Sequence, residues 1–296
     1  MPARGTSRHR HRRRLDVSRR SEVSGMSMRK VGDLPSALGE GGAVEPRLAG
    51  HKPAVFLDYD GVLTPIVDRP EDAVMSDDMR TTLRELATRC PVCIVTGRDR
   101  AMAQQLMGVD DLVVAGSHGF DIWTPQQGSI SDDRVSGFLD LIAEVTDRLR
   151  DDVGSIPGVQ IEPKRASVAV HYRHVAPEDR DRVVDSVQTL LAENSDRVAL
   201  TPGKMVYELK PNIDWDKGKA VLHLISVLGL GGDDVLPLYL GDDITDEDAF
   251  RALRERGIGI FVGRADDPEV GDRDTAAQFV LGSVDEVKRF LASLGR

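Results

Sequence analysis

The chain has 296 residues and carries 39 Lys and Arg against 49 Asp and Glu, a formal net charge of −10 at pH 7. This length provides for one large or two ordinary domains. No stretch approaches the roughly 20 consecutive apolar residues that a membrane-spanning helix needs, so we expect no membrane partner.

The basic residues gather at the N-terminus. Residues 1–30 hold ten Lys and Arg and two Asp and Glu, so residues 31–296 hold 29 basic and 47 acidic side chains. An acidic body argues against nucleic acid as a partner. The Arg-rich start lacks apolar periodicity and the apolar segment of a secretory signal, so we expect residues 1–50 to be a disordered basic extension. A transit peptide, a nucleic-acid-binding arm and a start of translation at Met26 or Met28 are alternatives for this extension.

A short apolar run, Ala54–Leu57, predicts a buried strand that ends in Asp58-Tyr59-Asp60-Gly61. Gly61 allows the sharp turn that the end of such a strand requires. Two neighbouring carboxylates repel each other unless a cation lies beside them, which predicts a metal site where one carboxylate can also act as a nucleophile. On their own, these residues also fit an ordinary turn or part of a calcium loop, so the interpretation depends on the rest of the chain.

The next segments alternate between helices and strands. An amphipathic helix begins at Ser76 or Asp77, and a second helix runs through Met102 and Leu106. The apolar runs Val92–Val95 and Leu112–Ala115 predict two further strands. This alternation is typical of an α/β fold with a doubly wound parallel sheet.

The two cysteines, Cys90 and Cys93, lie in a Cys-Pro-Val-Cys stretch. Redox-active pairs lie at a helix N-terminus, whereas Cys93 enters a predicted strand, so we expect two buried thiols rather than a redox pair. Free thiols favour a reducing compartment, the cytoplasm.

The pattern changes after about residue 122 and returns near residue 211. Residues 123–210 predict a separate α+β cap, inserted into a core made of residues 51–122 and 211–296. The cap has two expected helices and four expected strands: Arg134–Arg150 and Pro177–Ala192, then Gln160–Ile161, Ser167–Tyr172, Val198–Leu200 and Val206–Lys210.

The returning pattern completes the core. The expected elements are the helix Asp216–Leu228, the strand Leu236–Leu240, the helix Asp246–Arg256, the strand Ile258–Val262 and the helix Val284–Leu294. The strand Leu236–Leu240 ends in an acidic run, Gly241–Asp248.

Polar side chains follow several of these strands and should meet at one edge of the sheet. They are Asp58 and Asp60, Thr96, Asp242 and Asp243, with Lys217 at the start of a helix. Carboxylate oxygens suit Mg²⁺, and a Lys and a Thr hydroxyl can neutralise a transferring phosphoryl group. Because the sequence contains no Gly-x-x-x-x-Gly-Lys-Ser/Thr loop, hydrolysis is favoured over transfer from ATP.

Four segments together resemble the haloacid dehalogenase superfamily of phosphohydrolases and, within it, the trehalose-6-phosphate phosphatase family. The resemblance covers roughly residues 52–290 and rests on Asp58–Val67, Ile94–Arg98, Trp215–Lys219 and Gly241–Phe250. It implies a core with an inserted cap and a phosphatase that needs Mg²⁺.

The resemblance also implies roles for individual residues. Asp58 would be the nucleophile and a metal ligand, and Asp60 the general acid and then base, with its backbone carbonyl at the metal. Thr96 would bind the phosphoryl group, and Lys217 would hold both the phosphate and Asp58.

For the metal, the resemblance implies Asp242 as a ligand, with Asp243 and Asp246 in support. Val62 departs from the Thr often found there, without consequence for the chemistry.

The same resemblance places substrate-binding residues on the cap and beside it. A charged strand face is the alternative explanation for each of them, and His171 is expected to be structural. The expected sugar-binding residues are Glu162, Lys164, Arg173, Lys204 and Glu208, with His118 and Asn212 in the core segments.

The resulting expectation is a cytoplasmic, monomeric enzyme that uses Mg²⁺ to hydrolyse trehalose 6-phosphate to trehalose and phosphate. Its partner is a small-molecule sugar phosphate. A phosphatase for another disaccharide or polyol phosphate and a non-catalytic sugar-phosphate sensor remain alternatives.

Overall fold

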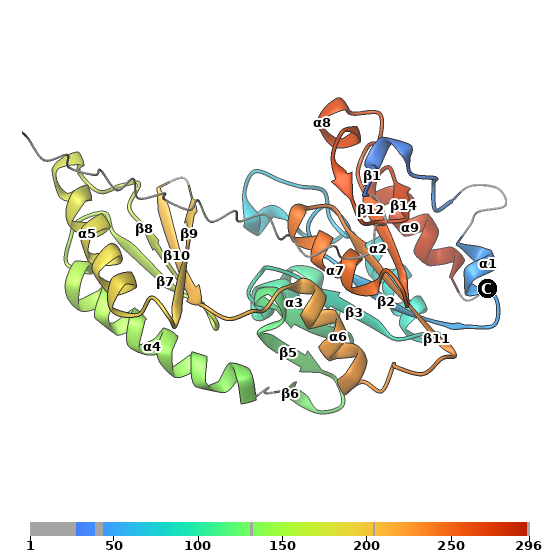
Figure 1. Cartoon of the computed structure of the whole chain (residues 1–296), viewed down its shortest axis with the longest axis horizontal. Helices are drawn as coiled ribbons and strands as arrows, with labels where there is room; N and C mark the ends of the chain where they lie inside the picture. The colour runs from blue at the N-terminus through green and yellow to red at the C-terminus, as the bar shows by residue number, and fades with distance from the viewer. Residues whose placement is uncertain (1–27, 39–43, 131–132, 204, 295–296) are drawn as a thin grey trace, which may run out of the picture.

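The computed structural model describes residues 28–38, 44–130, 133–203 and 205–294 (Figure 1). An eight-stranded sheet forms the larger part and a four-stranded sheet the smaller part, and the two lie side by side. The predicted fold class, a doubly wound α/β core with an inserted cap, is confirmed.

The large sheet is parallel except at one edge, where two antiparallel strands extend it. In spatial order its strands are β14 (Phe279–Leu281), β12 (Ile258–Val262), β11 (Val235–Gly241), β2 (Lys52–Leu57), β3 (Val92–Val95), β4 (Val113–Gly116), β5 (Asp121–Thr124) and β6 (Gly128–Ile130).

Strand β2 is buried on both faces because it lies in the middle of this sheet. Val55 and Leu57 belong to one hydrophobic core, and Ala54 and Phe56 to the core on the opposite face. The first core is closed by α2 (Asp77–Ala87), α3 (Arg100–Met107) and α9 (Val284–Ser293), and the second by α6 (Lys217–Val227) and α7 (Glu247–Leu253).

The predicted start of α2 is confirmed, because Ser76 is its N-cap and its hydroxyl accepts from the backbone N–H of Met79 at 3.3 Å. Short elements complete the core: α1 (Glu45–Leu48), α8 (Pro268–Gly271), the paired strands β1 (Arg29–Lys30) and β13 (Asp274–Thr275), and the 3-10 turns η1 (Val31–Asp33), η2 (Pro70–Asp72), η3 (Ser117–Gly119) and η4 (Ile244–Asp246).

The cap has one sheet and two helices. The strand order is β7 (Gln160–Pro163), β8 (Val168–His171), β10 (Val206–Pro211) and β9 (Val198–Gly203), all antiparallel. Helices α4 (Asp133–Val153) and α5 (Pro177–Glu193) cover the face that points away from the large sheet (Figure 1). Neither helix covers the other face of the cap sheet, which is called the open face below.

The expected beginning of the cap at residue 123 needs correction. Strands β5 and β6 form a hairpin on the edge of the large sheet, so the cap layer starts only with α4. The hairpin strands are short, and the polar turn between them conceals their alternation in the sequence.

The expected disorder up to residue 50 is also wrong for the described part, residues 28–38 and 44–50. Val31 and Leu34 are buried in the core beside α6 and α7, and β1 pairs with β13. The basic composition of the whole extension conceals these few apolar positions, whose burial stabilises the segment. Residues 1–27 lie outside the described residues, so their disorder stays a prediction.

Cys90 and Cys93 are free and buried, as expected. Burial raises the pKa of the Cys90 thiol to about 11 and raises that of Cys93 further, so neither carries the thiolate that redox chemistry needs. Within the described residues, no helix combines the length and apolar character of a membrane span.

Candidate functional site

Asp58 follows β2 directly and is 6% exposed. One of its carboxylate oxygens accepts a hydrogen bond from the backbone N–H of Tyr59 at 2.7 Å. The other accepts from the ammonium group of Lys217, also at 2.7 Å. Two fixed donors therefore hold the carboxylate in one orientation at the carboxyl end of the central strand.

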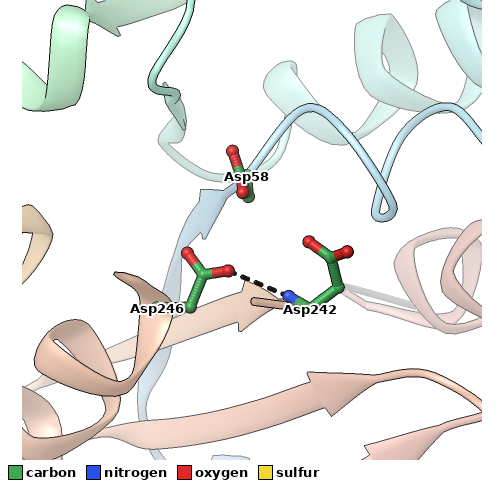
Figure 2. Close-up of side chains that lie close together, drawn as sticks. All are labelled: Asp58, Asp242 and Asp246. Atoms are coloured by element: carbon green, nitrogen blue, oxygen red, sulfur yellow. Dashed lines mark hydrogen bonds between the residues drawn. The ribbon is translucent and has the colours of Figure 1, made fainter. Parts of the chain in front are cut away.

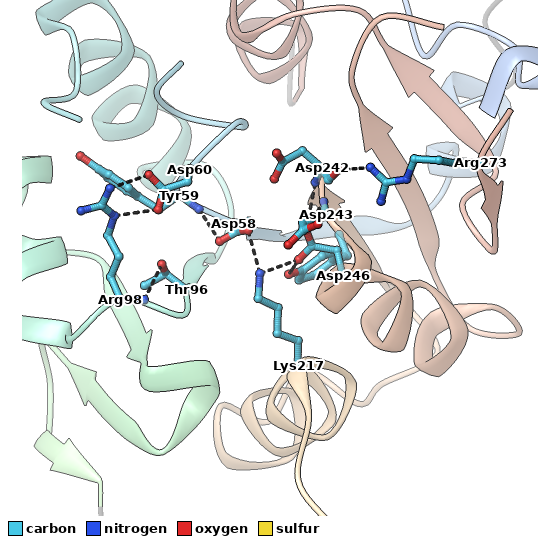
Figure 3. A network of polar contacts seen from close by, with 11 residues as sticks. Asp58, Tyr59, Asp60, Thr96, Arg98, Lys217, Asp242, Asp243, Asp246 and Arg273 are labelled. Carbon is cyan, nitrogen blue, oxygen red and sulfur yellow. Dashed lines mark hydrogen bonds and ion pairs between the residues drawn. The ribbon is translucent and has the colours of Figure 1, made fainter. Parts of the chain in front are cut away.

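Lys217 is the first residue of α6 and is 3% exposed. It also donates to Asp246, at 2.7 Å, so one ammonium group connects two buried carboxylates. Asp246 further accepts from the Tyr239 hydroxyl at 2.6 Å and from two backbone N–H groups, those of Asp242 and Asp243. Asp246 thereby fixes both Lys217 and the turn after β11 (Figure 3).

Asp242 follows β11 and faces Asp58 across the sheet edge. Gly61, in the left-handed region with φ of 70°, allows this approach, because a Cβ there would lie 2.1 Å from a carboxylate oxygen of Asp242. Oxygens of Asp58, Asp242 and Asp246 all lie within 4.8 Å of one another (Figure 2). These three residues are called the acidic cluster below.

Burial dominates the electrostatics of the acidic cluster. It raises the pKa of Asp58 to about 8, with Asp246 adding to the rise and Lys217 opposing it. Burial and Asp246 likewise raise the pKa of Asp242 to about 7. Burial lowers the pKa of Lys217, but Asp58 and Asp246 raise it by more, so the lysine stays charged.

The acidic cluster fits a divalent cation. One lysine does not offset three crowded carboxylates, and oxygen ligands are those that Mg²⁺ prefers. The oxygens of Asp246 already accept four hydrogen bonds, so Asp58 and Asp242 are the members that offer lone pairs to an ion. Asp246 instead holds the ammonium group of Lys217 and the backbone N–H of Asp242 in position.

Thr96 and Asp60 lie at the same sheet edge. Thr96 follows β3 and is buried, and its hydroxyl accepts from the backbone N–H of Arg98 at 3.2 Å. The Asp60 carboxylate pairs with Arg98 and lies outside the acidic cluster, as does the exposed Asp243 at the start of η4. The metal roles of Asp60 and Asp243 stay predictions.

On the cap, predicted residues meet in one row across the open face of the sheet. Glu162 lies opposite Ala169, which lies opposite Glu208, and Glu208 lies opposite Thr201. Paired residues of antiparallel strands share a face, so the two carboxylates flank the buried side chain of Ala169 on the face that the helices do not cover.

The charged residues of this row have partners on the cap itself. Glu208 accepts from the Ser167 hydroxyl at 2.7 Å and from Lys164 at 3.2 Å. Glu162 lies 2.9 Å from the ring nitrogen Nε2 of His171.

The remaining predicted residues are less well placed for a sugar. Asn212 donates its side-chain amide to the carbonyl of Ser195 at 3.1 Å, and Arg173 is exposed beyond the end of β8. Lys204 lies outside the described residues. His118 is half-buried, and burial lowers its pKa, followed by the charges of Lys217 in the core and Lys210 on the cap.

An apolar groove of about 760 Å³ begins beside Gly61 and Asp242 and runs over the ends of β12 and β14. Apolar side chains such as Pro65, Ile66 and Val284 line much of it. A sugar needs hydrogen-bonding partners, so the open face of the cap suits it better than this groove.

Several contacts in the site were not predicted from the sequence. The pair between Arg98 and Asp60 and the Tyr239 hydroxyl on Asp246 depend on side-chain directions within the folded sheet. The buried Asp121 pairs with Arg165 of the cap at 3.1 Å, which ties the cap to the core. Only its place in the sequence pointed to Arg98 as a site residue, because it lies two residues after Thr96, close to the end of a strand.

Comparison with known proteins places these features in a family. The family model for trehalose-phosphatase matches residues 56–285. The trehalose-phosphate phosphatase of Mycolicibacterium paratuberculosis is 43% identical over 90% of this chain and 68% of its own length. The corresponding protein of Mycobacterium tuberculosis is 39% identical over 90% of this chain and 67% of its own length.

An uncharacterized glycosyl hydrolase of Mycobacterium tuberculosis is 41% identical over 89% of this chain, which spans only 20% of that relative's length. Among solved structures, trehalose-6-phosphate phosphatase of Aspergillus fumigatus has a TM-score of 0.61 at 27% identity, and covers 88% of this chain and 98% of its own. The C-terminal domain of the C. albicans enzyme has a TM-score of 0.62 at 24% identity, with the same coverage. The expected family is confirmed by these matches: the chain belongs to the trehalose-phosphatase family.

Proposed function

We propose that this protein is a Mg²⁺-dependent phosphatase that hydrolyses trehalose 6-phosphate to trehalose and phosphate through an aspartyl-phosphate. The observation that supports this most strongly is Asp58, a buried carboxylate fixed by Lys217 beside a cluster suited to a cation. A sensor would need to bind the phosphate but would not need a fixed nucleophile.

In the first half-reaction, a carboxylate oxygen of Asp58 forms a bond to phosphorus, and the bond between phosphorus and the sugar oxygen breaks. Asp60 gives its proton to that departing oxygen, which leaves as the sugar hydroxyl. In the second half-reaction, water attacks phosphorus and gives a proton to Asp60. The bond from phosphorus to Asp58 breaks, and inorganic phosphate leaves.

Thr96 and Lys217 stabilise the transferring group from two sides. The Thr96 hydroxyl can donate to a phosphoryl oxygen, and the ammonium group of Lys217 offsets charge beside Asp58. Asp58 and Asp242 would hold a bound Mg²⁺, which would supply the further positive charge that an anionic nucleophile needs beside an anionic phosphate.

The open face of the cap supplies sugar recognition in this proposal. Glu162 and Glu208 can accept hydrogen bonds from sugar hydroxyls, and Lys164 can donate one. Lys204 and Arg173 stay candidates for the same role.

The free thiols of Cys90 and Cys93 support a reducing compartment, the cytoplasm. We also propose that the protein is a monomer with no partner beyond the sugar phosphate.

The test is phosphate release from a panel of sugar phosphates, with Mg²⁺ and with a chelator, for the wild type and for Asp58→Asn. We expect release from trehalose 6-phosphate well above the other sugars, abolished by the chelator and by the substitution. Release from other sugars alone would reject the substrate and keep the reaction. The absence of any release that depends on Asp58 would reject the enzyme and favour a sensor.

A further inference from the structure

Arg98 contacts Asp60 through both of its carboxylate oxygens. Nε donates to one oxygen and Nη2 to the other, each at 2.7 Å (Figure 3). The Arg98 side chain is 12% exposed, whereas that of Asp60 is 39% exposed. The arginine is thus the buried and fixed member of the pair.

Further contacts keep the guanidinium group in place. Nη1 donates to the carbonyl of Pro70 at 2.7 Å, and the group lies 5.6 Å from the centre of the Tyr59 ring. The backbone carbonyl of Arg98 accepts from Ser117 at 2.7 Å, and its N–H donates to Thr96. Arg98 therefore presents a rigid pair of donors to Asp60 rather than a mobile surface charge.

The geometry of the pair fixes the orientation of the Asp60 carboxyl group. Both of its oxygens accept from N–H donors of one planar guanidinium group, so the carboxyl group cannot rotate without losing one of the two hydrogen bonds. A proton acceptor must lie in a defined orientation to take a proton from the attacking water, as the second half-reaction proposed above requires.

We propose that Arg98 is a positioning residue that orients Asp60 for proton transfer during hydrolysis of the aspartyl-phosphate. This inference rests on the proposed function. Arg98 touches neither phosphate nor sugar in this role and acts through Asp60 alone. The half-reaction that it favours is the attack of water, during which the proton of water passes to Asp60 and phosphate leaves Asp58.

The experiment separates the two half-reactions with p-nitrophenyl phosphate, whose good leaving group needs little help from an acid. Rapid-quench kinetics give the rates of formation and decay of the phosphoenzyme for the wild type, Arg98→Met, Arg98→Lys, Asp60→Asn and the double variant. For Arg98→Met we expect decay about 30-fold slower, formation within about 3-fold of the wild type, and an unchanged Tm. Arg98→Lys should recover part of the loss, because an ammonium group keeps the charge but not the paired donors.

The double variant decides whether Arg98 acts through Asp60. In the Asp60→Asn background, Arg98→Met should change the decay rate by less than about 2-fold. Arg69→Met is the matched control, because Arg69 pairs with Glu71 in an exposed loop and should change neither rate. Equal losses in both backgrounds, or a loss confined to formation, would overturn the proposal.

This test does not depend on the sugar. If p-nitrophenyl phosphate is split and trehalose 6-phosphate is not, the proposed substrate fails while the role of Arg98 is still decided. If no phosphoenzyme forms on Asp58, the proposed mechanism fails, and the proposal for Arg98 fails with it.

Discussion

The acidic cluster of the core and the open face of the cap both carry charged residues, but they hold them differently. Asp58, Lys217 and Asp246 are at most 6% exposed, and each has two or more fixed partners. Lys164 and Glu208 on the cap are about a third exposed, and their pair is 3.2 Å long. In the proposed function, the buried network holds the reacting groups in place, whereas the half-exposed residues can exchange their partners for the hydroxyls of a substrate.

The largest expected effect comes from Asp58, the proposed nucleophile. Asp58→Asn should lower kcat by roughly four orders of magnitude, because the covalent step is lost. The variant should remain folded with an equal or higher Tm, since burial disfavours the charge that is removed. Phosphate release and thermal unfolding measure the two effects, and a variant with lost activity and a much lower Tm would instead assign Asp58 a structural role.

A matched pair of lysine substitutions sharpens the comparison between the two regions. Lys217→Met leaves two buried carboxylates without their cation and should cost about 3–5 kcal/mol of unfolding free energy. Lys164→Met breaks a half-exposed pair and should cost less than about 1 kcal/mol. Urea unfolding of both variants gives these values, and similar costs would contradict the distinction.

His118 should make stability depend on pH. Burial, followed by the charges of Lys217 and Lys210, lowers the pKa of His118 to about 4 from its ordinary value of 6.5. The unfolded chain therefore binds a proton first as the pH falls, so up to about 3 kcal/mol of stability is present above pH 6.5 and lost toward pH 4.

The measurement for His118 is urea unfolding between pH 7.5 and 4, beside His118→Asn. Asn does not titrate and tolerates the left-handed backbone at this position, where φ is 57°. The difference in stability between wild type and variant should shrink as the pH falls. A difference that stays constant with pH would show that the histidine titrates alike in both states.

The smallest expected effect lies on the cap. Glu208→Gln should raise KM for trehalose 6-phosphate about 10-fold and change kcat by less than about 3-fold, because it weakens sugar binding without touching the phosphate. Hydrolysis of p-nitrophenyl phosphate serves as the control and should not change. An equal loss with both substrates would place Glu208 in the chemistry rather than in recognition.

The sequence predicted which residues meet at the sheet edge, but not how their side chains pair. Asp58, Thr96 and Asp242 each follow a strand of a parallel sheet, so their positions along the chain were enough to place them at one edge. The pairing of Asp60 with Arg98 could not be predicted, because it depends on side-chain directions across a turn.

The boundary of the cap was also hard to predict from the sequence, because it depends on which strands pair. Strands β5 and β6 continue the large sheet through one short antiparallel hairpin, and only strand pairing shows which sheet they join. Likewise, Val31 and Leu34 gain their burial from contacts with residues more than 200 positions away, which the composition of the basic extension conceals.

The most direct test of the account is to trap the phosphoenzyme. Quenching the enzyme during turnover of trehalose 6-phosphate, reducing the acyl phosphate with borohydride and sequencing the peptides by mass spectrometry identifies the residue that carried it. We predict homoserine at position 58, and none in Asp58→Asn. Rapid phosphate release without a reduced residue at position 58, or with one at another carboxylate, would contradict it.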